Sequence, residues 1–244
     1  RGEYGAALAL LEESFLDAGG DLTSGAYHVF STDPVDIVNP FFLPPQNSGE
    51  VLAAHPSFVE DARRDSDGNI VDARVEGPEA KVVRRNETFE RANLESDWGF
   101  FVYRTQLDPI PIIRNAELVL IRAEANLLAD APDLPAVVQD LNLIRRAAGL
   151  GDYSGDVTEE ALLDELLYQR RYELYGEGHR WVDVRRLLAE NDPNCPPDTD
   201  EVPEPTATTR STCLNAYLPV EQDGVEADAW LMFPLPQNEV ELGS

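Results

Sequence analysis

Apolar side chains recur at helical spacing in the first twenty residues of the chain. Within residues 3–18, Tyr4, Leu8, Leu11 and Phe15 lie three or four positions apart, so they share one face of a helix. Two glycines follow directly and supply a helix stop. The pattern predicts an amphipathic helix over 3–18.

The pattern becomes strongly helical again from residue 112. Residues 114–129 are apolar on most faces, which indicates a buried helix. A second helix is predicted over 135–148, with proline at its first position and glycine just past its end. A third is predicted over 158–175, and a shorter one over 179–190. We expect these helices to pair as antiparallel hairpins.

The segments around the helices have a different character. Residues 21–60 contain five prolines among several aromatics, which predicts a long irregular excursion. Residues 70–75 and 100–103 alternate like short strands. Residues 191–229 read as an acidic, proline-rich loop, and the apolar segment 230–239 reads as extended.

Composition narrows the choice of function. The chain of 244 residues has 46 acidic and 19 basic residues, which gives a net charge of −27, and its apolar fraction of 43% argues against general disorder. Nucleic acid and anionic lipid are excluded as electrostatic partners, because both require clustered Lys and Arg. A neutral ligand, such as a sugar, meets no such electrostatic penalty.

Lys81 is the only lysine, and the other bases are arginines. An acidic surface with little lysine fits a high-salt habitat, where salt screens self-repulsion, and it equally fits a GC-rich genome. No apolar run reaches the length of a membrane span. The chain starts without Met, so we expect a processed product, a fragment or a partial chain, with any targeting signal or lipid-anchor cysteine further upstream.

Few residues suggest a metal or a covalent cross-link. Cys195 and Cys213 lie close together in a loop without other metal ligands, which favours a disulfide, with free thiols as the alternative. Asp65, Asp67 and Asn69 resemble part of a calcium loop. That loop needs a glycine which is missing here, so a plain Asp-Gly turn is favoured. No phosphate, dinucleotide or nucleophile motif is present, and the sequence indicates no cofactor.

Several charged residues lie within the predicted helices and near their ends. Glu117 and Glu124 lie two turns apart on a largely apolar helix, and a buried carboxylate must be paired. An inter-helix Arg–Glu network that fixes helix register is therefore favoured over an acid–base site. The residues expected in this structural group are Arg114, Glu117, Glu124, Arg170, Arg171, Glu173, Glu177, Arg180 and Trp181.

Four segments resemble the signatures of one protein family. Residues 112–125 resemble its helical signature, and residues 141–150 resemble the helix that follows. Residues 169–186 resemble its most specific run, with Gln169 where a glutamate is usual. Residues 233–239, Phe-Pro-Leu-Pro-Gln-Asn-Glu, resemble its closing segment. In this order the segments resemble the C-terminal half of SusD/RagB-family nutrient-uptake outer-membrane lipoproteins.

The resemblance implies a mainly α fold of tetratricopeptide-like helical hairpins with long irregular loops and a few short strands. It implies one SusD-like domain, of which this chain is the C-terminal portion. Its parts would be a helical scaffold at 1–20 and 106–190, a loop-rich ligand-side segment at 21–105, and the acidic loop at 191–229.

The resemblance also implies a function. It implies a non-catalytic nutrient-binding subunit, with glycan as the expected nutrient, on the extracellular face of the outer membrane. Its partner would be a TonB-dependent, SusC-like transporter. One alternative is a helical-repeat surface scaffold or assembly protein without sugar binding. A weaker alternative is a carbohydrate-active enzyme that uses Glu117 or Glu124.

In this family the ligand-facing residues come from loops, and sugars stack their C–H faces on aromatic rings beside polar side chains. The alternative for each aromatic residue is that it only packs the loop onto the helices. The candidate ligand residues are Tyr27, His28, Phe30, Asn39, Phe41, Phe42 and Trp98.

Overall fold

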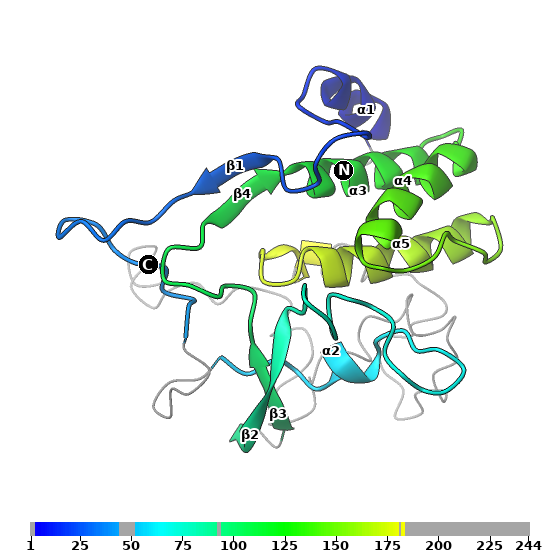
Figure 1. The fold of residues 1–244 in the computed structure, drawn as a ribbon. Coiled ribbons are helices and arrows are strands. Elements are labelled where there is room, and N and C mark those ends of the chain that lie inside the picture. The colour runs from blue at the N-terminus through cyan, green and yellow to red at the C-terminus, as the bar shows by residue number, and fades with distance from the viewer. Residues whose placement is uncertain (1–2, 44–51, 92–93, 181, 184–244) are drawn as a thin grey trace, which may run out of the picture. The chain divides into compact units, whose positions relative to one another are not determined.

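Figure 1 shows the fold of the computed structural model, which describes residues 3–43, 52–91, 94–180 and 182–183. Residues up to Arg180 form one unit, and the architecture below is that of this unit. Helix is the more abundant regular structure in its described part, as expected from the sequence. The helices are α1 (Tyr4–Glu12), α2 (Ser57–Glu60), α3 (Asn115–Leu127), α4 (Leu134–Ala147) and α5 (Glu159–Glu173).

Local capping signals set the boundaries of the two helices that follow α3. The Asp133 carboxylate accepts a hydrogen bond from the amide of Ala136 at 3.0 Å and begins α4. The Thr158 hydroxyl accepts one from the amide of Ala161 at 3.3 Å and begins α5. Both helices therefore lie within one or two residues of the predicted ranges.

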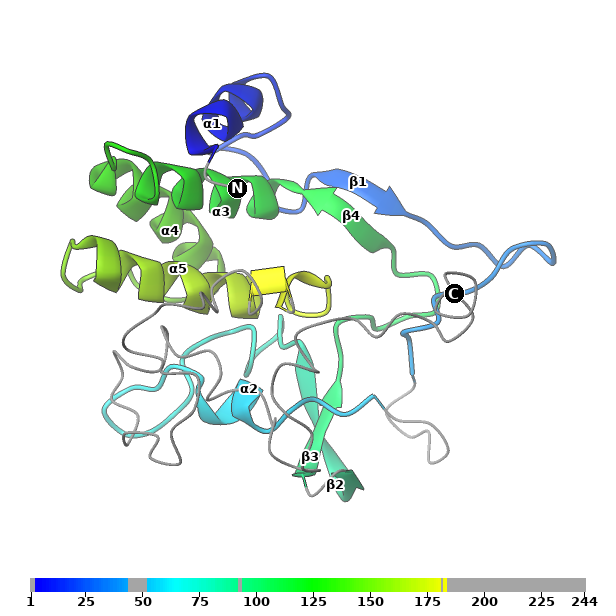
Figure 2. The ribbon, with the colours of Figure 1, turned by 180° about the vertical axis from the view of Figure 1, so that it is seen from behind.

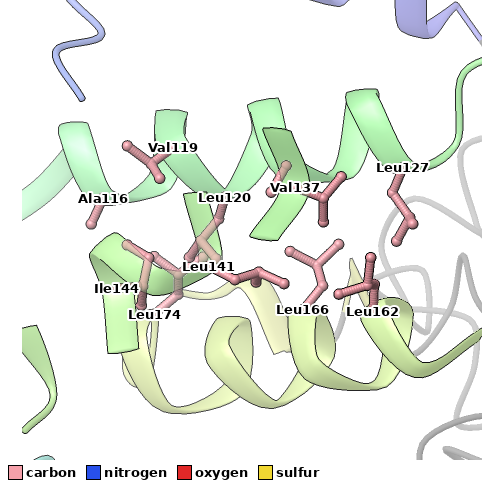
Figure 3. Close-up of a cluster of buried hydrophobic side chains, with 11 residues drawn as sticks. Ala116, Val119, Leu120, Leu127, Val137, Leu141, Ile144, Leu162, Leu166 and Leu174 are labelled. Carbon is pink, nitrogen blue, oxygen red and sulfur yellow. The ribbon is translucent and has the colours of Figure 1, made fainter. Parts of the chain in front are cut away.

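Helices α3, α4 and α5 pack around one apolar core, shown in Figure 3, with their side chains pointing towards one another. Removing these side chains from water is the main favourable free energy that holds the helices together. The buried members are Ala116, Val119, Leu120, Ala123, Leu127, Val137, Leu141, Ile144, Leu162, Leu166 and Leu174.

Helix α1 packs against α3 and is shorter than predicted, ending at Glu12 rather than near residue 18. The chain leaves the helix because Asp17 is held by a different partner. The amide of Asp17 donates to Asn115 Oδ1 at 2.9 Å, and Asn115 Nδ2 donates back to the carbonyl of Asp17 at 2.7 Å. The periodicity of apolar residues along the helix could not predict this long-range pair of hydrogen bonds.

Two antiparallel strand pairs complete the unit. Strand β1 (Gly25–His28) pairs with β4 (Ile110–Arg114), and β2 (Val82–Arg91) pairs with β3 (Leu94–Phe100). Gly25 is required at its position, because a Cβ there would lie 2.2 Å from the carbonyl oxygen of Ile113.

The two short strands predicted from the sequence were misplaced. Residues 70–75 form turns, and Ile70 makes only an isolated bridge with Arg64. Of the predicted strand 100–103, only Phe100 belongs to a strand, as the last residue of β3. Residues 112–114, predicted as the start of the helical part, belong to strand β4, because this segment pairs with β1 rather than with its own neighbours.

A second apolar cluster joins α2 and the start of β2 to α5. Phe58 and Val82 are buried in it with Tyr172 of α5, and the Tyr172 hydroxyl donates to the carbonyl of Phe58 at 3.0 Å. Figures 1 and 2 both show α5 between helices α3 and α4 on one side and α2 with the β2–β3 hairpin on the other. Helix α5 is thus the element that both clusters share.

Within the described ranges, the structure contains no helix with the length and apolar character needed to cross a lipid bilayer.

The core position of Leu141 predicts a large loss of stability on truncation. We expect Leu141→Ala to lower the free energy of unfolding by about 2–5 kcal/mol, because it leaves a cavity between the three helices. Leu10→Ala is the matched control, since Leu10 is 67% exposed, and its effect should stay within about 0.5 kcal/mol. Urea unfolding followed by circular dichroism measures both, and equal effects would contradict this assignment of the core.

Candidate functional site

A cluster of opposite charges surrounds the last residue of α5, Glu173. Its carboxylate pairs with Arg114 at 2.8 Å and with Arg74 at 3.4 Å. Its backbone carbonyl accepts hydrogen bonds from Arg114 Nη2 at 2.6 Å and from Lys81 Nζ. Cations at the carboxyl end of a helix also interact favourably with the helix dipole. The cluster therefore closes α5 and ties it to the start of β2 and the end of β4.

Arg114 also binds Glu177, in the turn that follows α5. Its Nε lies 3.1 and 3.0 Å from the two carboxylate oxygens of Glu177, and its Nη2 donates to one of them at 2.7 Å. Gly176 and Gly178 have positive φ angles of 83°, which let the chain turn sharply around Glu177. A side chain at Gly176 would also meet the ring of Phe100 at 2.8 Å.

The charges of this cluster are balanced and fixed. Burial alone would raise the pKa of Glu173, but the attraction of Lys81, Arg114 and Arg74 outweighs it and lowers the pKa to about 2. Arg74 also binds Asp72 through Nε at 2.9 Å and Nη2 at 2.7 Å. The cluster thus contains three cations and three carboxylates, so its charges balance. The cations are Arg74, Lys81 and Arg114, and the carboxylates are those of Asp72, Glu173 and Glu177.

The other charged residues predicted as structural are also engaged. Arg170 lies 3.7 Å from Glu124, and His179 lies 3.6 Å from Glu117. Arg171 joins α5 to α2, since its Nη1 donates to Asp61 at 2.9 Å and its Nη2 to Ser57 at 2.8 Å. Arg180 takes part in an interaction as well, and Trp181 lies outside the described residues.

The sequence missed a second buried network, centred on Glu165 of α5. Its carboxylate accepts hydrogen bonds from Arg145 Nη1 at 2.7 Å, from Gln169 Nε2 at 2.7 Å and from Arg63 Nη1 at 3.0 Å. Arg63, Arg74 and Lys81 come from the irregular part of the chain. Only the rarity of Lys81, the sole lysine, could have drawn attention to one of them.

An aromatic corner forms where the segment around Asn39 meets the turn at residues 103–108. Asn39 is buried, and its Nδ2 donates to the carbonyl of Asp108 at 2.7 Å while its Oδ1 accepts from the amide of Phe41 at 2.8 Å. The Phe41 ring stacks on buried Tyr103, with centroids 6.2 Å apart and planes at 29°, and Phe41 remains 48% exposed. Asn39 therefore acts as the anchor that presents the ring of Phe41 to solvent.

The remaining candidate ligand residues are not gathered at this corner. Tyr27 donates its hydroxyl to the carbonyl of Thr23. His28 packs edge-on against buried Phe30, with ring centroids 4.7 Å apart. Phe42 is half-buried beside Phe41 in the chain, and Trp98 lies on β3 against the second apolar cluster.

The acidic run at residues 65–69 forms a turn closed by its own side chain. Asp65 Oδ1 accepts the amides of Asp67 and Asn69, each at 2.9 Å, and Asp65 Oδ2 accepts Asn69 Nδ2 at 3.1 Å. Across the described part of the chain, no group of three or more His, Cys, Asp or Glu residues is arranged to hold a metal ion. Cys195 and Cys213 lie outside the described residues.

A comparison with known protein families identifies the chain. A model described as SusD family matches residues 90–243. The chain belongs to the SusD family. The match includes the signature segments from residue 112 onwards and confirms the resemblance seen in the sequence. It also spans Arg114, Glu173 and Glu177 of the ion cluster, whereas Asn39 and Phe41 lie outside it.

The fold of this chain is similar to that of a solved structure. A SusD superfamily protein from Parabacteroides distasonis matches with a TM-score of 0.52 and 18% identity, over 75% of this chain and 45% of that one. A SusD superfamily protein from Bacteroides vulgatus matches with a TM-score of 0.45 and 24% identity, over 73% of this chain and 39% of that one. The chain thus spans less than half of either solved relative. No curated protein matches it.

The ion cluster of this SusD-family chain makes its stability depend on Glu173. We expect Glu173→Gln to lower the free energy of unfolding at pH 7 by about 3–5 kcal/mol, because Arg74, Lys81 and Arg114 lose the anion that they share. The pKa of Glu173 is about 2 in the folded chain, below its ordinary value of 4.5. The stabilisation is therefore complete above pH 4.5 and is lost as the pH falls towards 2.

The difference in stability between the wild-type chain and Glu173→Gln should accordingly shrink between pH 4.5 and pH 2. Urea unfolding at a series of pH values measures it. Glu76→Gln is the control, because Glu76 is exposed, and it should match the wild-type chain throughout. A constant difference across this pH range would show that Glu173 does not titrate as described.

Proposed function

We propose that this protein is a non-catalytic nutrient-binding subunit of the cell surface, that its nutrient is a glycan, and that it works with a TonB-dependent, SusC-like transporter. Membership of the SusD family supports this function, since proteins of this family generally bind nutrients rather than transform them. The proposal includes a lipid-anchored position on the extracellular face of the outer membrane.

The proposal also covers the organisation of the chain. It takes the chain as the C-terminal portion of a single SusD-like domain, with tetratricopeptide-like helical hairpins as the scaffold. The short connection between α3 and α4, which pack on each other, supports a hairpin. In this organisation residues 21–105 form the ligand side. That segment also contains the β2–β3 hairpin, so it is less irregular than the sequence suggested.

The observation that carries glycan binding is the exposed ring of Phe41. Its backbone amide donates to Asn39 Oδ1 and its ring stacks on Tyr103, so the platform is ordered before any ligand arrives. A sugar ring can stack its C–H face on such a ring, and little conformational entropy is lost when the platform is already ordered. Phe41 is therefore the residue that we propose for ligand contact, with Asn39 and Tyr103 as its supports.

The contacts of the carboxylates considered for catalysis favour a binding role. Glu117 faces His179 and Glu124 faces Arg170, so each is engaged with a positively charged or protonatable side chain. Such pairs suit the fixing of helix register. They favour binding over the acid–base alternative.

Substitution of Phe41 tests glycan binding. We expect Phe41→Ala to weaken the affinity for the bound glycan by at least about fivefold, because roughly 1 kcal/mol of stacking is removed. Phe15→Ala is the matched control, since Phe15 is 47% exposed, nearly as much as Phe41. Isothermal titration against a panel of oligosaccharides measures the affinities. Equal losses in the two variants would contradict the role of Phe41.

The transporter partnership needs a separate measurement. We expect a SusC-like transporter to co-purify with the affinity-tagged protein from detergent-solubilised outer membranes. Purification without any such transporter, together with binding of no glycan on the panel, would favour a surface scaffold instead.

A further inference from the structure

The Lys and Arg side chains of the described residues interact with other groups of the same chain. Each Lys or Arg whose side chain the structure describes is engaged within the chain. Even highly exposed arginines form ion pairs with carboxylates, as Arg84 does with Asp97 at 2.6 Å and Arg146 with Asp152 at 2.7 Å. Most of these Lys and Arg side chains are paired with carboxylates, so an anionic ligand would compete with an anion of the chain for these cations.

The surroundings of Phe41 follow the same pattern. Arg104, in the turn that carries Tyr103, donates to the carbonyls of Pro78 at 2.8 Å and Ala80 at 3.1 Å, and its guanidinium lies 4.8 Å from the ring centroid of Phe101. Both hydrogen bonds use Nη2, and the positive charge of Arg104 also attracts the carboxylate of Asp108. An anionic ligand at Arg104 would compete with that carboxylate.

Carboxylates, in contrast, accompany the platform on both of its segments. Asp33 and Asp36 precede Phe41 in the same segment and accept hydrogen bonds from the amides of Val35 and Ile37, at 3.1 and 2.8 Å. Asp108 accepts the amides of Arg104 at 2.6 Å and of Thr105 at 3.1 Å. The amides that bind Asp33 and Asp36 are neutral and orient these carboxylates without cancelling their charge. The charge of Asp108 is partly offset by Arg104.

We propose that the platform at Phe41 selects uncharged glycans and excludes anionic ones, such as uronic-acid or sulfated polysaccharides. This inference rests on the proposed glycan binding and adds the charge class of the ligand. Hydroxyl groups of a neutral sugar can donate to carboxylates and accept from amides. A sugar carboxylate or sulfate offers acceptors alone and is repelled, at low salt, by Asp33 and Asp36, which lie eight and five residues before Phe41, and by Asp108.

The way in which affinity changes with salt concentration distinguishes repulsion of an anionic glycan from attraction. Screening lengths fall from about 30 Å at 0.01 M salt to about 3 Å at 1 M. Repulsion of an anionic glycan should therefore weaken as salt is added, so its affinity should rise. An anionic ligand held by ion pairs would show the opposite dependence, with affinity falling in high salt. A neutral glycan should bind almost independently of salt.

Pairs of polysaccharides with the same backbone and different charge provide the probes. We would use dextran with dextran sulfate, and fully methyl-esterified polygalacturonate with polygalacturonate, in affinity gel electrophoresis and titration calorimetry. For a backbone that is bound, we expect the anionic member to bind at least about tenfold more weakly near 0.01 M salt, with the gap narrowing towards 1 M.

A single added cation should relax the exclusion locally. Leu107 is 42% exposed and lies in the turn to which Asn39 is bonded, beside the carbonyl of Gln106 that accepts the Asn39 amide at 2.9 Å. Leu107→Lys should raise the affinity for the anionic member by about fivefold at low salt and leave the neutral member almost unchanged. Leu10→Lys, on α1, makes the same change in net charge away from the platform and should have less than about half of that effect.

The outcomes separate this inference from the function on which it rests. Binding of neither member of any pair, at any salt concentration, contradicts glycan binding and overturns the inference with it. Equal or preferred binding of the anionic member, with affinity that falls in high salt, overturns charge selection alone. Equal gains in Leu107→Lys and Leu10→Lys also overturn it, because the exclusion would then come from the net charge rather than from the platform.

Discussion

The fold of this chain depends on how the carboxyl end of α5 is held. At Glu173 a carboxylate and a backbone carbonyl receive cations from distant parts of the sequence, Arg74, Lys81 and Arg114. A buried charge without its partner is costly, so these groups favour one arrangement in which all are satisfied. Since α5 also contributes to both apolar clusters, this end of the helix fixes the position of the β2–β3 hairpin against the helices.

The scaffold and the proposed ligand platform are built differently. The scaffold uses apolar burial and ion pairs, and most of it lies within the segment that defines the family. The platform uses a buried amide, Asn39, and a ring stacked on Tyr103, and Phe41 lies outside that segment. The two are linked through charge. Because the few cations of the chain serve the scaffold, acidic groups remain to set the potential at the platform.

The accuracy of the sequence predictions follows the range of the interactions involved. Helices α4 and α5 were placed to within a residue or two, because their caps, Asp133 and Thr158, act on amides three positions away. The end of α1 was misplaced because it depends on Asn115, far along the chain. Of the β2–β3 hairpin, only its last residue, Phe100, was predicted to lie in a strand. Its strands are rich in charged residues, and their pairing shows no clear alternation in either strand taken alone.

By itself, the sequence determined the family, the helical core and the residue types available for ligand contact. It named Phe41 and Asn39 with equal weight, and only the tertiary structure separated their roles. Asn39 is buried and is hydrogen-bonded to the carbonyls of residues 106 and 108, whereas the side chain of Phe41 is exposed. The structure also decided which carboxylate the cations share. Burial and ion pairing depend on groups brought together by folding, and neither is encoded in any short stretch of sequence.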